Sequence, residues 1–278
     1  MVEAPEKPRG AGVRSKLPAG IVDAGFASLA TFVAGLIAVT LLNDVDRGIY
    51  AVFFVAFNLG AILAYQLVYV PAEIVAVGRP EKQRLTIIDD SLRIGRLPAL
   101  GGSMVILAAT ASTSPIAEVG LAIPLTVSAL IATYLSPTQD HLRRTLHIAN
   151  RPWHAAYMSI VQFVVTTAAI GLMWVFDVPV AWIPFGSLAI ANTLSMAFGR
   201  YLIYRDRHGA EAPSSVTFRE LSLQGRWLLF QAIIPALAAF ATANIITYLA
   251  SPEAMGYAEA ARIVAQPIMV AASGLTSA

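Results

Sequence analysis

The chain has 278 residues, of which 57 % are hydrophobic and only 13 % are charged, and its formal net charge is +2. About a quarter of the residues in a soluble domain are charged, so this composition excludes an ordinary water-soluble domain. The chain contains no cysteine, which excludes disulfides, thiolate metal sites and cysteine nucleophiles.

Eight segments are apolar enough to form transmembrane helices, because the hydrocarbon core of a bilayer needs about 20 apolar residues. In chain order they are Ile21–Leu42, Ile49–Val70, Leu97–Ser112, Ile116–Leu135, His154–Phe176, Val178–Gly199, Trp227–Leu249 and Met255–Ala278. The third is short, and the last contains charged residues. These continuous runs predict an all-α, polytopic helical membrane protein and disfavour a β-barrel, whose strands would alternate in polarity.

The lysines and arginines concentrate in alternate connections between the predicted spans. Of the 19 lysines and arginines, all but Arg47 and Arg262 lie in the first 20 residues or in the connections 71–96, 136–153 and 200–226. Cation-rich connections stay in the cytoplasm, so the sequence predicts a cytoplasmic N-terminus and a multi-pass protein of the cell's inner (cytoplasmic) membrane. The basic residues therefore reflect topology and do not indicate a nucleic-acid partner.

Two short acidic connections, at 43–51 and 250–258, resemble each other because Gly, Tyr and Ala follow each as the next span begins. Their offset of six helices predicts two parallel lobes, although chance similarity of interfacial residues is the alternative. The predicted organisation is a cytoplasmic tail (1–20), a six-helix lobe (21–199), a cytoplasmic linker with a short interfacial helix (200–226) and the first two helices of a second lobe (227–278). We expect a truncated chain or a naturally shortened copy.

Ionisable side chains within spans are costly and are candidates for functional sites. Arg262 follows Glu259 by three residues, so the two share one helix face. One interpretation is that Arg262 binds an anionic headgroup in a cavity while Glu259 holds it in place. The other is that the two residues form a structural ion pair. Asp23 lies near the inner end of the first span. It is either a carboxylate favoured by the helix dipole or a proton or sodium site that couples transport.

Neutral polar side chains within the spans either bind saccharide hydroxyls in a cavity or bond neighbouring helices. They are Asn58, Gln66, Gln162, Asn192, Gln231, Asn244 and Gln266.

Basic residues at the cytoplasmic end of the fourth span, Arg143, His147 and Arg151, are about four residues apart. They share a face if that helix continues to Pro152, and they either contact an anionic substrate headgroup or anchor the helix. Thr217 and Glu220 fit a capping box.

Four stretches together resemble the polysaccharide-biosynthesis (O-antigen type) flippases of the multidrug/oligosaccharidyl-lipid/polysaccharide exporter superfamily. They are DRGIYAVFFVAFNLGA (46–61), SPTQDHLRRTLHIANRPWHAAY (136–157), LQGRWLLFQAIIPALAAF (223–240) and GYAEAARIVAQPIMVAASGL (256–275). None is a catalytic signature.

This resemblance implies roughly twelve to fourteen helices in two lobes around a central cavity, of which four or more are missing here. It also implies alternating access that moves a polyprenyl-diphosphate-linked saccharide across the cytoplasmic membrane. The implied partners are that substrate, membrane lipids and the glycosyltransferases or polymerase of a polysaccharide pathway, with no cofactor.

An intramembrane enzyme is disfavoured because Asp89 and Asp90 lack the further spaced aspartates of a metal site. No histidine is expected deep in a span, and His141 and His147 are poorly spaced for chelation from one helix face. We therefore expect no catalytic or metal-binding residues.

Two further interpretations stay open. A cation-coupled drug antiporter of the same superfamily would need an acidic cavity in the first lobe, where only Asp23 and Glu118 are available, both near span ends. A non-transporting membrane partner of a polysaccharide assembly complex would account for the missing helices.

Overall fold

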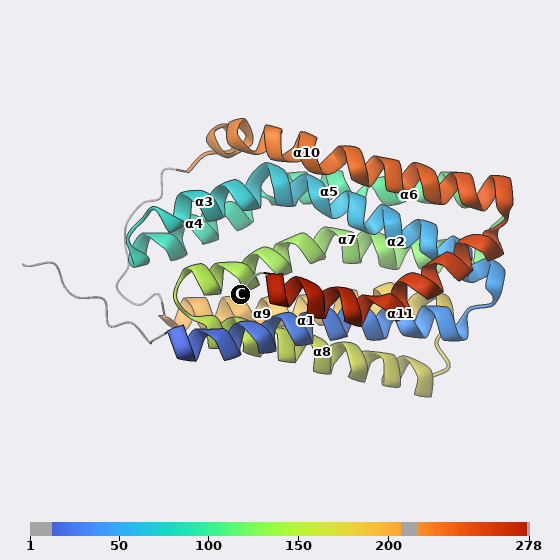
Figure 1. Cartoon of the computed structure of the whole chain (residues 1–278), viewed down its shortest axis with the longest axis horizontal. Coiled ribbons are helices and arrows are strands. Elements are labelled where there is room, and N and C mark those ends of the chain that lie inside the picture. Colours follow the sequence, from blue (N-terminus) through green and yellow to red (C-terminus); the bar gives the residue numbers. More distant parts are fainter. Residues whose placement is uncertain (1–12, 207–215, 277–278) are drawn as a thin grey trace, which may run out of the picture.

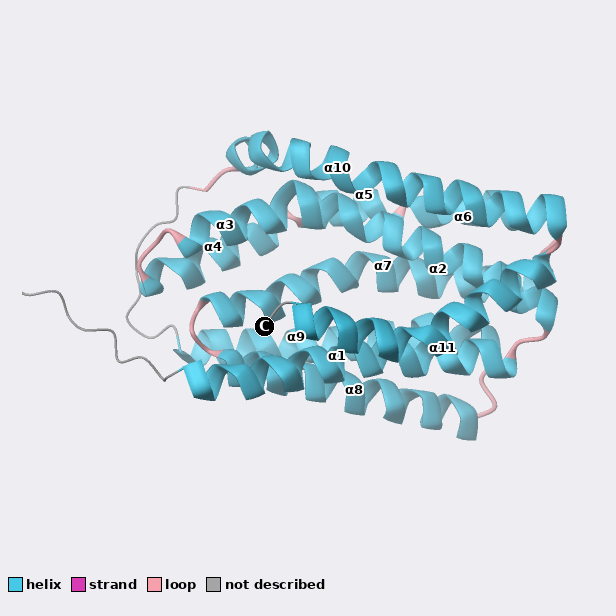
Figure 2. Cartoon of the chain, in the orientation of Figure 1, coloured by secondary structure: helices cyan, strands magenta, loops and turns pink. Residues whose placement is uncertain are grey.

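The structure is a computed structural model that describes residues 13–206 and 216–276. Within these ranges the chain is helical apart from short turns, and no strand occurs (Figure 2). The elements are α1 (Val13–Leu41), α2 (Asp44–Ala64), a π-helix (Tyr65–Tyr69), α3 (Val70–Val77), α4 (Glu81–Ile94), α5 (Arg96–Ser103), α6 (Val105–Thr113), α7 (Val119–Ile148), α8 (Pro152–Val175), a 3-10 helix (Val180–Trp182), α9 (Ile183–Asp206), α10 (Phe218–Ile245), a π-helix (Ile246–Ala250) and α11 (Pro252–Thr276).

Six helices within the described ranges are long and apolar enough to cross a membrane. They are Leu17–Leu41, Asp44–Val77, Val119–Ile148, Pro152–Val175, Val180–Arg205 and Phe218–Ala250. Gln83–Ile94 and Arg96–Thr113 meet at a bend of 41° and provide a seventh crossing if they act as one span. These helices confirm an all-α, polytopic helical membrane protein. The number of eight spans stays a prediction, since α11 is not among the six.

Consecutive long helices run antiparallel, so the connections alternate between the two ends of the bundle (Figure 1). The cation-poor connections, α1–α2, α6–α7, α8–α9 and α10–α11, lie at one end. The basic connections α3–α4 and α7–α8 lie at the other. The cation-rich and cation-poor connections of the sequence therefore lie at opposite ends of the bundle. The assignment of the basic end to the cytoplasm stays a prediction from the positive-inside rule.

Several helices extend beyond the predicted spans. α1 begins at Val13, inside the predicted tail 1–20, whose first 12 residues lie outside the described ranges. The predicted capping box is present at Thr217 and Glu220, but it begins α10 itself. The helix expected to lead into the seventh span therefore begins where predicted and is continuous with that span. No proline interrupts residues 218–227, so one continuous ladder of backbone hydrogen bonds runs into the span.

Turns of the same kind end α7 and α8. Asn150 and Asp177 adopt positive φ angles of 61° and 51°, a conformation that Asn and Asp tolerate better than most residues. The next amide then reaches back to a carbonyl of the last turn, from Arg151 to Leu146 at 2.8 Å and from Val178 to Met173 at 2.9 Å. These Schellman turns satisfy carbonyls that the helix ends would leave free.

The two similar acidic tips meet where α2 packs on α11. A Cβ atom added at Gly48 would lie 1.9 Å from the carbonyl oxygen of Pro252, and one added at Gly256 would lie 2.8 Å from that of Asp44. Each glycine thus faces the backbone of the other tip, and only a residue without a side chain permits this approach. The contact is reciprocal, as expected if the two helices occupy equivalent places in two lobes.

Candidate functional site

A polar cavity of about 460 Å³ opens among α1, α2, α7, α8 and α11. Five of the polar side chains singled out from the sequence line it: Asn58, Arg143, Gln162, Arg262 and Gln266. They come from four helices that are distant in sequence, so the fold brings them together. Ser28, Thr31, Ser136 and Gln139 add further hydrogen-bonding groups to the lining. The lining can therefore bind a ligand rich in hydroxyl groups and negative charge.

Arg262 presents its guanidinium group to this cavity. Its Nε and Nη2 atoms donate to the two carboxylate oxygens of Glu259 at 2.7 and 2.6 Å, as the spacing of three residues predicts. The Glu259 side chain is 1 % exposed, whereas that of Arg262 is 42 % exposed. The guanidinium also lies 4.4 Å from the centre of the Phe54 ring, a cation–π contact. Glu259 and Phe54 thus hold a cation that still has donors directed toward the cavity.

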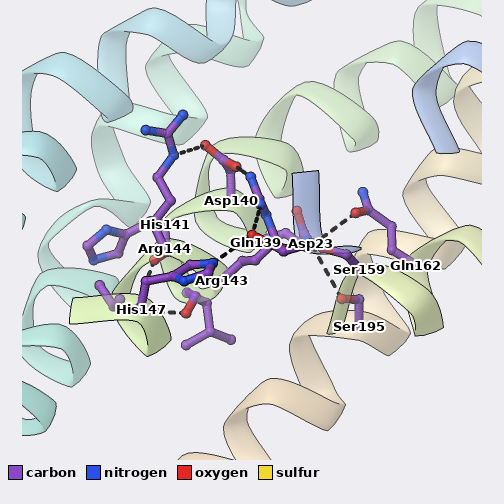
Figure 3. A network of polar contacts seen from close by, with 12 residues as sticks. Asp23, Gln139, Asp140, His141, Arg143, Arg144, His147, Ser159, Gln162 and Ser195 are labelled. Atoms are coloured by element: carbon purple, nitrogen blue, oxygen red, sulfur yellow. Dashed lines mark hydrogen bonds and ion pairs between the residues drawn. The ribbon is translucent and has the colours of Figure 1, made fainter. Parts of the chain in front are cut away.

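Arg143 lies at the other side of the cavity in a network that joins α1, α7 and α8 (Figure 3). Asp23 accepts hydrogen bonds from Arg143 Nη1 at 2.6 Å, from His147 Nε2 at 2.7 Å and from the Ser159 hydroxyl. Arg143 also pairs with Asp140, which accepts a second hydrogen bond from Arg144 Nε at 2.9 Å. The network connects side chains that are more than 100 residues apart.

The helix-dipole explanation of Asp23 is wrong, because α1 begins ten residues earlier and has no acidic residue in its first turn. Arg143, His147 and Ser159 stabilise this buried carboxylate instead. Arg143 and His147 were expected either to contact an anionic headgroup or to anchor the helix, and both donate to the Asp23 carboxylate within the protein. Arg151 precedes α8 as its N-cap residue and does not share the α7 face, because α7 ends at Ile148.

A chain of amides links α7, α8 and α9 behind the cavity. Gln139 Nε2 donates to Gln162 Oε1 at 3.2 Å and to Ser195 Oγ at 3.3 Å. Gln162 Nε2 donates to Asn192 Oδ1 at 2.8 Å. Asn192 is buried and does not line the cavity, so it joins helices. Gln162 both joins helices and lines the cavity.

Besides Asn192 and Glu259, three predicted cavity residues are outside the cavity lining: Gln66, Gln231 and Asn244. Gln66 lies in the π-helix that follows α2, and Gln231 is exposed on the outer face of α10. Asn244 donates to the Phe240 carbonyl of its own helix at 2.8 Å. Apolar runs in the sequence identify the membrane spans. Which polar side chains face the cavity depends on how each helix is rotated about its own axis, and apolar runs do not give that rotation.

His141 forms a second buried polar site that the sequence did not predict. Its Nδ1 atom lies 2.9 Å from Glu73 Oε1, its Nε2 atom lies 2.8 Å from Ser91 Oγ, and its ring stacks on Tyr69. The Ser91 hydroxyl also donates to the Ile88 carbonyl at 2.7 Å. The His141 ring therefore connects α7 with Glu73 of α3 and Ser91 of α4.

His141 is fully buried within α7 but follows the predicted span Ile116–Leu135 by six residues, so the expectation that no histidine lies deep in a span stays a prediction. Its partners are 68 and 50 positions away, so no local spacing indicated them. Asp140 was also missed, although its spacing from Arg143 and Arg144 could have indicated a pair.

A larger hollow of about 840 Å³ lies at the cation-poor end of the bundle and includes Asp44, Asp46, Glu118 and Glu253 in its lining. Glu118 precedes α7 as its N-cap residue, where the helix dipole favours a carboxylate. Within the described ranges, no three His, Asp or Glu side chains are grouped so that they could hold a metal ion.

Comparisons of the chain with protein-family models, with curated proteins and with solved structures find no match.

Proposed function

We propose that the chain is a membrane transporter of the flippase class, or the N-terminal part of one. It moves a polyprenyl-diphosphate-linked saccharide across the cytoplasmic membrane by alternating access, for polysaccharide biosynthesis. The observation that carries the proposal is the cavity between α1, α2, α7, α8 and α11, to which Arg262 and neutral polar side chains project. The Arg262 guanidinium group would bind the diphosphate, and the amide and hydroxyl side chains would form hydrogen bonds with the sugar.

The contact between α2 and α11 supports a two-lobed transporter. Gly48 and Gly256 each face the other helix's backbone, which is the relation expected of equivalent helices across an axis between two lobes. The cavity also lies beside this contact, since Phe54 and Arg262 belong to these two helices. Movement of one helix against the other would then open or close the cavity.

Charge favours an anionic substrate over an organic cation. The charged groups in the cavity lining are two arginines and one aspartate, Arg143, Arg262 and Asp140. Asp23, which a cation-coupled antiporter would use as its ion site, already accepts hydrogen bonds from three side chains. Asp140 pairs with Arg143 and Arg144, so the described lining of the polar cavity offers an organic cation no unpaired carboxylate.

Depletion of the protein in the cell that makes it tests the proposal. A flippase predicts that lipid-linked saccharide accumulates in the cytoplasmic leaflet, where an added membrane-impermeant glycosidase digests it only in inside-out vesicles. Accumulation in the outer leaflet would contradict flipping and would favour a partner of the polymerase. Unchanged leaflet distribution with shorter or longer polymer would favour the same non-transporting role.

A further inference from the structure

A second hollow, of about 380 Å³, lies among α4, α5, α7 and α9 and has no lining residue in common with the polar cavity. Its charged lining consists of Arg93, Arg96, Arg200 and Asp89. The basic residues come from three different helices, at the end of α4, the start of α5 and the second half of α9. This convergence depends on the fold and is not a run of neighbouring cations.

The charges of this hollow are unbalanced. Arg93 pairs with Asp89 at 3.3 Å, and the Arg93 side chain is 70 % exposed. Arg96 and Arg200 are exposed, and neither has an ion pair with a carboxylate in the described part of the chain. Both side chains line the same hollow, one from α5 and one from α9. Like charges held together favour an anion between them.

The rest of the lining is apolar. Ile88, Leu92, Leu142 and Ile203 line the hollow and belong to a cluster of buried hydrophobic residues. Arginine donors beside an apolar wall match a molecule that has a phosphate next to hydrocarbon. Guanidinium groups donate two parallel hydrogen bonds to phosphate oxygens, and basic pockets between transmembrane helices bind anionic lipid headgroups at the cytoplasmic side.

We propose that this hollow binds the phosphate of one anionic phospholipid, through Arg96 and Arg200, with the start of an acyl chain against Leu92 and Ile203. The bound lipid neutralises the excess charge and connects the ends of α4, α5 and α9. The site is separate from the polar cavity, so it does not depend on the proposed transport function.

Native mass spectrometry of the purified full-length chain in detergent tests the site with phosphatidylglycerol as the probe. Phosphatidylcholine with the same acyl chains tests the headgroup, and soluble glycerol phosphate tests whether the lipid part is needed. We expect one tightly bound phosphatidylglycerol, and binding about thirtyfold weaker in the double variant Arg96→Gln, Arg200→Gln. Equal retention of phosphatidylcholine, or equally tight binding of glycerol phosphate, would overturn the proposal.

The control is the double variant Arg219→Gln, Arg226→Gln, which removes the same charge from two exposed arginines of α10. It should bind phosphatidylglycerol like the unmodified chain, and an equal loss in the control would indicate diffuse attraction and no site. The variant Arg96→Lys, Arg200→Lys keeps the charge but loses the paired donors, so we expect an intermediate loss. Wild-type affinity in both Arg96, Arg200 variants would overturn the proposal.

Discussion

Arg143 and Arg262 both line the polar cavity, yet the protein holds them in opposite ways. Arg143 is 13 % exposed and bonds two carboxylates, Asp23 from α1 and Asp140 from its own helix. Arg262 is 42 % exposed and bonds one carboxylate, Glu259, from its own helix. Two cations at one cavity therefore serve different purposes. Arg143 ties helices together, and Arg262 keeps part of its charge available to a ligand.

The largest expected effect comes from Arg143→Gln. It leaves the Asp23 carboxylate buried without its guanidinium partner, and breaking a buried pair in this way costs about 3–5 kcal/mol. The midpoint of thermal unfolding in detergent, followed by tryptophan fluorescence, should fall strongly. The double variant Asp23→Asn, Arg143→Gln removes both charges and should recover part of the loss. A midpoint close to that of the unmodified chain in Arg143→Gln would contradict the structural role.

The position of Arg262 depends on the close approach of α2 and α11, which Gly48→Ala tests. The added methyl group meets the Pro252 backbone, and overpacking of this kind costs about 1–3 kcal/mol. Gly171→Ala in α8 is the matched control because nothing lies within 4 Å of its added Cβ. In a helix that change should stabilise slightly. The two variants should shift the unfolding midpoint in opposite directions, and equal shifts would argue against the close approach of α2 and α11.

A smaller effect is expected from Ser159→Ala, which removes one of three donors to Asp23. The hydrogen bonds from Arg143 and His147 remain, so the loss should be about 1 kcal/mol. Ser112→Ala provides the comparison, because the Ser112 hydroxyl donates to a carbonyl of its own helix. If Ser159→Ala has no more effect than Ser112→Ala on the unfolding midpoint, Asp23 does not depend on this cross-helix contact.

The same contrast explains which parts of the site were predictable from sequence. Glu259 and Arg262 are three residues apart, and helix geometry alone places them on one face. Asp23 and Arg143 are 120 positions apart, and their contact depends on how α1 and α7 both pack against α8. No spacing within one helix carries that information.

Fold and helix boundaries were predictable to different degrees. Continuous apolar runs identified the membrane helices, because burial in hydrocarbon depends on composition. The third predicted span, Leu97–Ser112, is covered by α5 and α6, and the bend of 41° before it was not predicted. The bend follows from packing and from a break at Gly95, and hydropathy does not report either one.

The central claim is that Arg262 offers its charge to a substrate, and the double variant Glu259→Gln, Arg262→Gln tests it most directly. The Glu259 side chain is 1 % exposed, so removing both charges leaves no buried carboxylate without its partner, and the unfolding midpoint should stay close to that of the unmodified chain. Expressed at equal level in cells that lack the unmodified protein, the double variant should lose export of surface polysaccharide, while Arg262→Lys should retain part of it. Full export by the double variant at an unchanged unfolding midpoint would contradict the account.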